Sequence, residues 1–515
     1  MSTPARVMLI VLDGWGVAPP SRRNAISQAR TPTITSLTEN YFTATLQASG
    51  IAVGLPWREE GNSEVGHMNM GAGHIVYQYL PRITEELRSG TFYQNPTFLE
   101  AIHHAKTYQS RLHVMGLFSS GNVHSSQEHF LGILDLAARE ELTEVVTHLF
   151  TDGKDGKPHE AVDMLQPLMG RLAHFAYKIP GSIAGRTYAL DRNGNWDLTK
   201  QTYEMLTKNV GAPASDPVSY LRDCYAKGYS DTDVPPVVFT QNEKPIPPIG
   251  ANDAVIFFDF REDSVRQLAR AFAAPTFDSF ERVLPENLFV VSMTEYEQGL
   301  PTHVAYPPPV IDMPLTQLLS ESGKRQLHVA ETEKYAHVTY FFNGAHEKPY
   351  PGEDRIMVRS EGGPHYDSAP QMQAARIAKE VVARINDYDF YLINFANADM
   401  VAHTGNLPAT IAGVEAIDQA LNELVGAARA FHVTVVITAD HGNAEDMMDP
   451  KTGLPKTNHT GNTVPFYVVG EGFEQRAKSF LHDMEPSGIL ADVAPTILRI
   501  MGLPQPPVMT GKSLL

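Results

Sequence analysis

Cysteine is almost absent from this chain of 515 residues, in which Cys224 is the only one. A single thiol excludes a disulfide framework, a zinc site built from thiolates and an iron–sulfur cluster. Long apolar runs are also missing, because none approaches the roughly 20 residues of a membrane-spanning helix. The apolar stretch at residues 7–12 is too short for the core of a signal peptide. These absences predict a cytoplasmic protein that binds no membrane.

Positive charge is scarce as well, since 41 lysines and arginines face 59 aspartates and glutamates, for a formal net charge of −18. This balance disfavours broad attraction to nucleic acid. An anionic substrate must therefore be captured by a local cluster of basic side chains. The length predicts two to four domains, at roughly 150 residues per domain.

Short apolar runs rich in β-branched residues recur along the chain, and each is followed by a longer amphipathic stretch. The runs predict buried strands at Val7–Leu12, Leu112–Leu117, Val145–Phe150, Ala254–Phe258, Asn287–Val291, Asp389–Asn394 and Val433–Thr438. The amphipathic stretches predict helices at Gln127–Arg139, Ala161–Phe175, Ser264–Phe272, Gln371–Ile385 and Ala409–Ala430. Alternation of strands and helices indicates parallel, doubly wound sheets, and hence an α/β fold.

Proline is concentrated in two places. Pro307, Pro308 and Pro309 form a stiff stretch by composition, which predicts a linker between domains. Proline and glycine also crowd residues 234–250, which we expect to form a long surface loop rather than a second boundary.

Acidic and imidazole side chains follow three of the predicted strands. Because ligands bind beyond the carboxyl ends of parallel strands, these side chains are expected to converge on one site. They are Asp13, Asp399 with His403, and Asp440 with His441, and His459 lies in a loop where it can complete the cluster. Each alone is typical of a turn or a cap, but together they suit Mn²⁺ or Zn²⁺. Two such ions about 3.5–4 Å apart would form a clamp for phosphoryl transfer.

The candidate ligands lie at both ends of the chain. Asp13 and the residues beyond 395 must meet in space to form one site. The segment between them is therefore predicted to be a domain inserted into the first.

Ser63 lies in the sequence GNSEVGH at 61–67 and has two interpretations. It is typical of a helix N-cap. It can also be a nucleophile at a helix N-terminus, where free N–H groups and the helix dipole favour an attached phosphate. A metal ion would lower the pKa of its hydroxyl, so no Ser-His-Asp triad is needed.

Ordered sequence blocks connect these residues. They are VLDGWG at 11–16, GNSEVGHMNMGAG at 61–73, SSGNVHS at 119–125, TDGKD at 151–155, GRTYALDR at 185–192, FDFRED at 258–263, ETEKYAHVTYFFNG at 331–344, NFANADMVAHTG at 394–405, TADHGNAE at 438–445 and TNHTGNTVPF at 457–466. In this order they resemble the cofactor-independent phosphoglycerate mutases, members of the alkaline phosphatase superfamily. The resemblance spans nearly the whole chain.

The resemblance implies an alkaline-phosphatase-like α/β domain at 1–77 and 312–515 that holds two metal ions and the serine. A second α/β domain, the phosphotransferase domain, would be inserted at 78–311 and bind the substrate. One metal ion would be held by Asp399, His403 and His459, and the other by Asp13, Asp440, His441 and the oxygen of Ser63. We expect the ions to be Mn²⁺, with Co²⁺ and Zn²⁺ as alternatives.

The implied reaction interconverts 3-phosphoglycerate and 2-phosphoglycerate through a phosphoserine on Ser63, without bisphosphoglycerate. Asp155 would handle the proton of the substrate hydroxyl. The glycerate would be held by His124, Lys154, Arg186 and Arg192, and the phosphate by Arg261 and Lys334. Enclosure would keep water from the phosphoserine. We expect the chain to act as a monomer on this small phosphorylated substrate.

Several positions depart from the family pattern. Lys154 and His74 stand where the family has arginine, and Ser264 stands where a second arginine follows Arg261. Glu262 adds an acidic residue next to Arg261. Arg266 follows Ser264 by two residues, which on a helix places the two side chains about 200° apart. The sequence WREE at 57–60 replaces a more typical loop.

These departures keep two alternatives to a phosphoglycerate mutase open. The first is a related mutase or phosphatase that uses the same phosphoserine chemistry on another phosphorylated acid or sugar. The second is a metal-binding protein without catalysis that serves as a partner or regulator.

Overall fold

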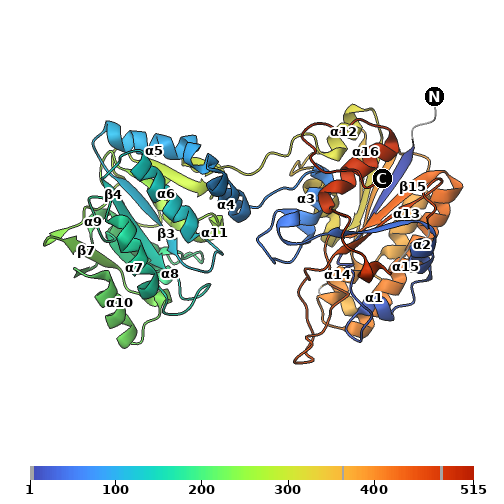
Figure 1. Ribbon diagram of the computed structural model, residues 1–515, viewed down its shortest axis with the longest axis horizontal. Helices are drawn as coiled ribbons and strands as arrows, with labels where there is room; N and C mark the ends of the chain where they lie inside the picture. The colour runs from blue at the N-terminus through green and yellow to red at the C-terminus, as the bar shows by residue number, and fades with distance from the viewer. Residues whose placement is uncertain (1–4, 362, 364, 476–479) are drawn as a thin grey trace. The chain divides into compact units, whose positions relative to one another are not determined.

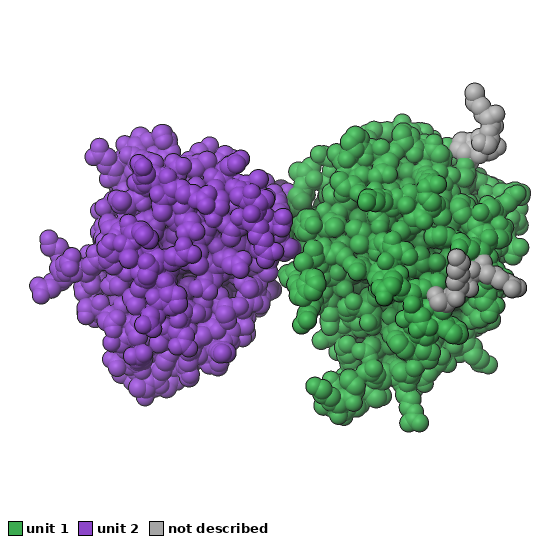
Figure 2. Space-filling view, in the orientation of Figure 1, with its two compact units in different colours: residues 1–78, 309–515 green, residues 79–308 purple. Residues whose placement is uncertain are grey.

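The computed structural model describes residues 5–361, 363, 365–475 and 480–515 (Figure 1). The chain divides into two compact units, each of which is described by itself (Figure 2). The first unit consists of Met1–Gln78 and Pro309–Leu515, and the second of Tyr79–Pro308. The second unit is therefore an insertion into the first. Within the described residues, no helix is both long and apolar enough to cross a membrane.

The first unit is built on an eight-stranded sheet with the order β13-β12-β14-β1-β15-β16-β2-β17. These strands are β13 Glu353–Val358, β12 Gln326–Glu331, β14 Phe390–Phe395, β1 Arg6–Leu12, β15 Val433–Thr438, β16 Val464–Val469, β2 Phe42–Gln47 and β17 Gly488–Ile489. The strands from β13 to β15 are parallel, whereas β16 is antiparallel to both neighbours. Parallel strands flanked by helices are the doubly wound arrangement that the sequence predicted.

Helices cover both faces of this sheet (Figure 1). On one face, α1, α2, α13 and α14 pack against the long helix α15, and on the other face α12 and α16 pack with α3. Their bounds are α1 Ala25–Gln28, α2 Pro32–Asn40, α3 Ser63–Ala72, α12 Leu315–Glu321, α13 Ala374–Val382, α14 Asn397–Ala402, α15 Leu407–Ala430 and α16 Val493–Met501.

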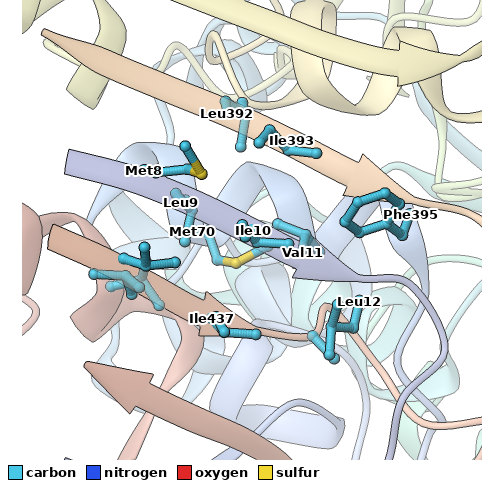
Figure 3. Close-up of a cluster of buried hydrophobic side chains, with 14 of the residues drawn as sticks. Met8, Leu9, Ile10, Val11, Leu12, Met70, Leu392, Ile393, Phe395 and Ile437 are labelled. Atoms are coloured by element: carbon cyan, nitrogen blue, oxygen red, sulfur yellow. The ribbon is translucent and has the colours of Figure 1, made fainter. Parts of the chain in front are cut away.

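The core of the first unit is centred on β1, whose residues 7–12 are fully buried (Figure 3). A strand covered on both faces is apolar along its whole length, which explains the unbroken run of sequence. β1 pairs with β14 so that Leu12 lies opposite Phe395, and with β15 so that Val11 lies opposite Thr438. The three strands therefore end at the same edge of the sheet.

The second unit has its own sheet, in which the strands follow the order β11-β10-β9-β3-β4-β5-β7-β6, with β8 paired to β7. The strands are β3 Leu112–Phe118, β4 Val145–Thr151, β5 Ser182–Gly185, β6 Ala212–Ala214, β7 Val237–Gln241, β8 Lys244–Pro245, β9 Ala254–Phe257, β10 Phe289–Thr294 and β11 His303–Tyr306. The helices are α4 Tyr79–Ser89, α5 Pro96–Thr107, α6 Gln127–Arg139, α7 Ala161–Leu172, α8 Arg186–Ala189, α9 Trp196–Lys208, α10 Pro217–Ala226 and α11 Glu262–Ala273.

The prediction of a surface loop at residues 234–250 is wrong. β7 lies within this segment and pairs with β5 and β6, and its residues Val237, Val238 and Phe239 are buried. The prolines lie just outside this strand, where they remove no hydrogen bond from its interior. The high proline content of the segment therefore led to a prediction of loop although it contains a short apolar strand.

Candidate functional site

Acidic and imidazole side chains follow the ends of β1, β14 and β15. Asp13 follows β1 directly, Asp399 lies in α14 just after β14, and Asp440 and His441 follow β15. Possible ligand atoms of Asp13, Asp440 and His441 lie within 4.8 Å of one another, and so do those of Asp399, His441 and His459. All three carboxylates are buried. The two groups share His441 and form one cluster, which we call the metal cluster.

His403 belongs to the metal cluster although it is half-exposed. Its Nε2 atom lies 3.1 Å from Oδ1 of Asp399 and 3.1 Å from Nε2 of His459. It caps the end of α14, one helical turn after Asp399. The structure thus brings together the seven residues for which metal binding was predicted, namely Asp13, Ser63, Asp399, His403, Asp440, His441 and His459.

The three imidazoles are oriented by backbone carbonyl groups. Nδ1 of His403 lies 2.7 Å from the carbonyl oxygen of Thr457, Nδ1 of His459 lies 2.8 Å from that of Gly61, and Nδ1 of His441 makes a 3.3 Å contact with a neighbouring carbonyl. A carbonyl oxygen only accepts, so each Nδ1 atom carries the hydrogen. Each Nε2 atom therefore faces the carboxylates, which is the orientation that metal-binding histidines adopt.

The charges of the metal cluster favour a cation. Burial opposes a charge on His441, but the carboxylates of Asp440, Asp13 and Asp399 raise its pKa to about 9. Burial would raise the pKa of Asp440, yet His441 and Lys334 help to hold that pKa well below its usual range. Buried carboxylates that remain ionised beside inward-facing Nε2 atoms fit a divalent metal ion.

Ser63 is the first residue of α3, but it does not cap the helix. The cap is Asn62, whose side chain accepts a hydrogen bond from the N–H of Val65 at 2.9 Å. The hydroxyl of Ser63 instead lies 2.9 Å from Nε2 of His441 and donates to Oδ1 of Asp13 at 3.2 Å. The serine oxygen is therefore available to the metal cluster, as a nucleophile at a helix N-terminus must be.

Lys334 supplies a buried positive charge to the same cluster. It ends a short 3-10 turn after β12, and its ammonium donates to Ser63 Oγ at 2.8 Å and to Asp399 Oδ2 at 2.7 Å. It also lies 2.7 Å from Oδ1 of Asp13. Although burial opposes its charge, these carboxylates raise the pKa of Lys334 above its ordinary value. The ammonium therefore stays protonated beside the nucleophile.

Three residues that orient the cluster were missed from the sequence. Nδ1 of His67 donates to the carbonyl oxygen of Ser63 at 2.9 Å and lies 3.3 Å from Oδ2 of Asp440. Asn394 donates to Oδ2 of Asp13, and Asn443 donates to Oδ1 of Asp399, both at 2.8 Å. His67 lies four residues after Ser63 on α3, and that spacing was the one available signal for its position.

Predicted substrate-binding residues of the second unit are joined in a hydrogen-bond network. Arg186 donates to Oδ2 of Asp155 at 2.8 Å and to Nε2 of His124 at 3.0 Å. Nδ1 of His124 lies 3.0 Å from the hydroxyl of Ser264, and it donates because its other nitrogen accepts. Burial and the charge of Arg186 lower the pKa of His124 to about 4, so this imidazole is neutral. This network holds a carboxylate, a neutral imidazole and a guanidinium close together.

Two further arginines share one carboxylate. Arg192 donates to Oδ2 of Asp263 at 2.5 Å, and Arg261 donates to Oδ1 at 3.1 Å. Both guanidinium groups remain about half-exposed and can bind an anion. The side chain of Lys154 is exposed, whereas Arg266 donates to the carbonyl oxygen of Tyr296 at 2.7 Å.

Residues 57–60, the loop that departs from the family pattern, lie next to two histidines of the metal cluster, His403 and His459. A cavity of about 520 Å³ is lined by Arg58, Glu59, Glu60, Gly61, Asn62, His403, Asn458 and His459. Trp57 precedes this lining and is 74% exposed. His74 lies elsewhere in the first unit, where its Nδ1 atom contacts the carbonyl oxygen of Ala72 at 3.1 Å.

Comparison with known proteins bears on this geometry. The family model described as "Metalloenzyme superfamily" matches residues 5–505. A 2,3-bisphosphoglycerate-independent phosphoglycerate mutase of Thermomicrobium roseum is 44% identical, over 100% of this chain and 99% of the relative. The protein of the same name in Moorella thermoacetica is 43% identical, over 99% and 98%. A crystal structure of Leishmania mexicana phosphoglycerate mutase at low cobalt concentration gives a TM-score of 0.58 at 28% identity, over 99% and 97%.

Fold and cluster thus define a class of protein, the enzymes of the metalloenzyme superfamily. Within that class, the chain belongs to the family of 2,3-bisphosphoglycerate-independent phosphoglycerate mutases. The resemblance that the ordered sequence blocks indicated is confirmed, and so is the α/β fold class.

Proposed function

We propose that this chain is a phosphoglycerate mutase of glycolysis and gluconeogenesis that interconverts 3-phosphoglycerate and 2-phosphoglycerate. One observation carries the proposal. The Ser63 hydroxyl is spared from capping α3 and lies within hydrogen-bonding distance of Asp13, His441 and Lys334. An uncapped serine among carboxylates, imidazoles and an ammonium is suited to accept a phosphoryl group.

The metal cluster would hold two divalent ions. We assign one to Asp399, His403 and His459, and the other to Asp13, Asp440, His441 and the oxygen of Ser63. We propose Mn²⁺, because carboxylates favour it and imidazoles accept it, with Co²⁺ and Zn²⁺ as alternatives. When bound, the ions supply a lowered pKa for the serine hydroxyl and neutralisation of charge on the transferring phosphoryl group.

The reaction needs no bisphosphoglycerate, because the phosphoryl group returns to the glycerate that donated it. Ser63, with its hydroxyl deprotonated, forms a bond from Oγ to phosphorus while the bond from phosphorus to the 3-oxygen breaks. Asp155, protonated at the start, gives its proton to that leaving oxygen. As a carboxylate it then takes the proton of the 2-hydroxyl, whose oxygen attacks phosphorus while the bond from phosphorus to Ser63 Oγ breaks. Lys334 remains charged beside Ser63 and offsets the negative charge of the phosphoryl group.

The second unit would act as the phosphotransferase domain, whose residues hold the glycerate. We assign this role to His124, Lys154, Arg186 and Arg192, and assign phosphate binding to Arg261 together with Lys334. The contact between Arg186 and Asp155 supports it, because the guanidinium keeps the carboxylate oriented. Each unit has its own apolar core. We propose that the chain acts as a monomer in the cytoplasm.

A second candidate is a mutase or phosphatase that acts on another phosphorylated acid or sugar. The observation that favours it is the absence of a second arginine after Arg261. The hydroxyl of Ser264 is paired with His124, and the guanidinium of Arg266 is paired with Tyr296. With fewer cationic side chains at this position, the site would be less specific for the phosphate group of one small substrate.

Rapid acid quench of the Mn²⁺-loaded protein with 3-phosphoglycerate tests the proposal directly. Peptide mass spectrometry is expected to find phosphate on Ser63 within the first turnovers. The Ser63→Ala variant should lose phosphate and turnover while it still folds and binds metal. Ser320→Ala, which removes an exposed hydroxyl of the same unit, serves as the control. Turnover by Ser63→Ala, or phosphate on another residue, would overturn the proposal.

A further inference from the structure

Glu445 is a buried carboxylate to which three loops of the first unit donate hydrogen bonds. Oε2 accepts from the backbone N–H of Gly16 at 3.1 Å and of Asn443 at 2.8 Å. Oε1 accepts from the hydroxyl of Thr460 and from the amide of Asn462 at 2.9 Å. The residue is 1% exposed, so these bonds replace its contact with water.

Each of the three loops also carries a proposed metal ligand. Gly16 follows Asp13, Asn443 follows His441, and Thr460 directly follows His459. The loops touch through their backbones as well, because Thr460 N–H donates to the carbonyl oxygen of Gly442 at 2.9 Å and Ala444 N–H to that of Gly14 at 3.0 Å. One side chain thus joins loops whose separations set the distances within the metal cluster.

Two glycines leave room for this carboxylate. A Cβ atom at Gly16 would lie 2.2 Å from the carboxyl carbon of Glu445, and one at Gly442 would lie 2.4 Å from its Oε1. Neither position tolerates a side chain while the carboxylate remains in place. The loops are therefore shaped around Glu445 rather than closed independently of it.

The donor pattern requires a carboxylate. Each oxygen accepts two hydrogen bonds, so an amide in either orientation would turn an NH₂ group toward two donors. Replacement by glutamine changes almost no volume and still breaks the arrangement. Replacement by aspartate keeps the charge but withdraws it by one methylene.

We propose that Glu445 is a positioning residue that fixes the relative places of Asp13, His441 and His459 and thereby sets metal affinity and coordination. None of its four hydrogen bonds is to the side chain of a proposed metal ligand, so it would act through the loops that carry those ligands. The inference rests on the proposed function for its relevance to catalysis, but its test reads metal binding directly. Groups that orient metal ligands typically change metal affinity by about 10–100-fold when they are lost.

The test compares Glu445→Gln with Glu353→Gln in the full chain. Glu353 is another buried carboxylate of the same unit, and it accepts from Asn343 at 2.8 Å and from the N–H of Tyr350 at 3.0 Å. Titration with Co²⁺ gives the dissociation constant by calorimetry and the ligand field by visible absorption. Glu445→Gln is expected to weaken Co²⁺ binding at least about 10-fold and to change the spectrum. Glu353→Gln should lower the melting temperature but leave the affinity and spectrum unchanged.

Unchanged Co²⁺ affinity and spectrum in Glu445→Gln, with only a lower melting temperature, would make Glu445 a structural residue and overturn the inference. If that variant does not fold, Thr460→Val removes one donor and should shift the spectrum in the same sense, whereas an unchanged spectrum contradicts the inference. Failure of the proposed function is distinguishable, because the wild-type protein would then bind Co²⁺ normally but form no 2-phosphoglycerate.

Discussion

Ser63 draws its proposed reactivity from its neighbours in space rather than in sequence. His441 and Lys334 lie 378 and 271 positions away along the chain, yet their nitrogens approach the serine oxygen to 2.9 and 2.8 Å. Asn62 satisfies the first turn of α3 in its place. A hydroxyl that had to cap the helix would be less available to a phosphoryl group.

A single hydrogen bond of Ser264 tests the hydrogen-bond network of the proposed substrate-binding residues. The Ser264→Ala variant leaves the buried Nδ1–H of His124 without its acceptor, which costs about 1–2 kcal/mol. We expect kcat/KM for 3-phosphoglycerate to fall about 5–30-fold, a factor that corresponds to this free energy. Steady-state kinetics measure it, with Ser292→Ala as the control for loss of a buried hydroxyl of the second unit. Equal kcat/KM in Ser264→Ala and wild type would show that Ser264 does not orient His124.

The metal-cluster residues could be predicted because their types and their places after strands agree with one chemistry. Their supporting residues could not. Asn394 lies inside the apolar strand β14 and donates to Asp13, and nothing in its neighbours along the chain signals that partner. The sequence does not signal the role of Glu445 either, because its donors come from loops far apart along the chain.

At the scale of elements, the strands that are buried on both faces were the most predictable. Val433–Thr438 and the helix Gln127–Arg139 coincide with β15 and α6. β12 was missed although all six of its residues are buried, because polar residues interrupt its apolar pattern. Gln326 donates to the carbonyl oxygen of Thr316, and His328 to that of Val338, at 2.7 Å each. Each of these buried polar residues thus has one hydrogen-bond partner that only the tertiary structure supplies.

The short helix α14 contributes two residues, Asp399 and His403, to the metal cluster. Asp399 lies in the first turn of this short helix and His403 at its C-cap, so one turn presents both side chains to the same site. β1 and β15 contribute the residues that follow their carboxyl ends. An edge of a parallel sheet thus gathers ligands that no single element could supply.

At the scale of the whole molecule, the two units carry separate cores and separate sets of titratable groups. In the second unit, Asp253 lies 3.1 Å from Nε2 of His113, whose Nδ1 lies 2.9 Å from Nε2 of His148. Nδ1 of His148 lies 2.8 Å from the hydroxyl of Ser182. Burial lowers the pKa of both histidines, and it lowers that of His129 to about 3.

These histidines predict that the second unit loses stability in mild acid, an effect partly offset by Asp259, whose pKa burial raises to about 7. Their pKa values in the folded protein lie below the ordinary value of 6.5, so the unfolded chain takes up protons first as the pH falls. The stabilisation is complete well above pH 6.5 and declines as the pH falls through it; for His129, whose pKa burial lowers to about 3, the loss is about 2 kcal/mol at pH 5. Hydrogen exchange of peptides from β3 and β4, corrected for intrinsic rates, measures the opening free energy. The same free energy at pH 7 and pH 5 would contradict this prediction.

The most direct test of the account is phosphorus NMR of the Mn²⁺-loaded protein with 3-phosphoglycerate and no bisphosphoglycerate. The account predicts a growing signal of 2-phosphoglycerate, without free phosphate, until equilibrium is reached. A signal of free phosphate alone would mean that Ser63 transfers its phosphoryl group to water, and an unchanged spectrum would mean that 3-phosphoglycerate is not the substrate. Either result would contradict the assignment of this chain as a phosphoglycerate mutase.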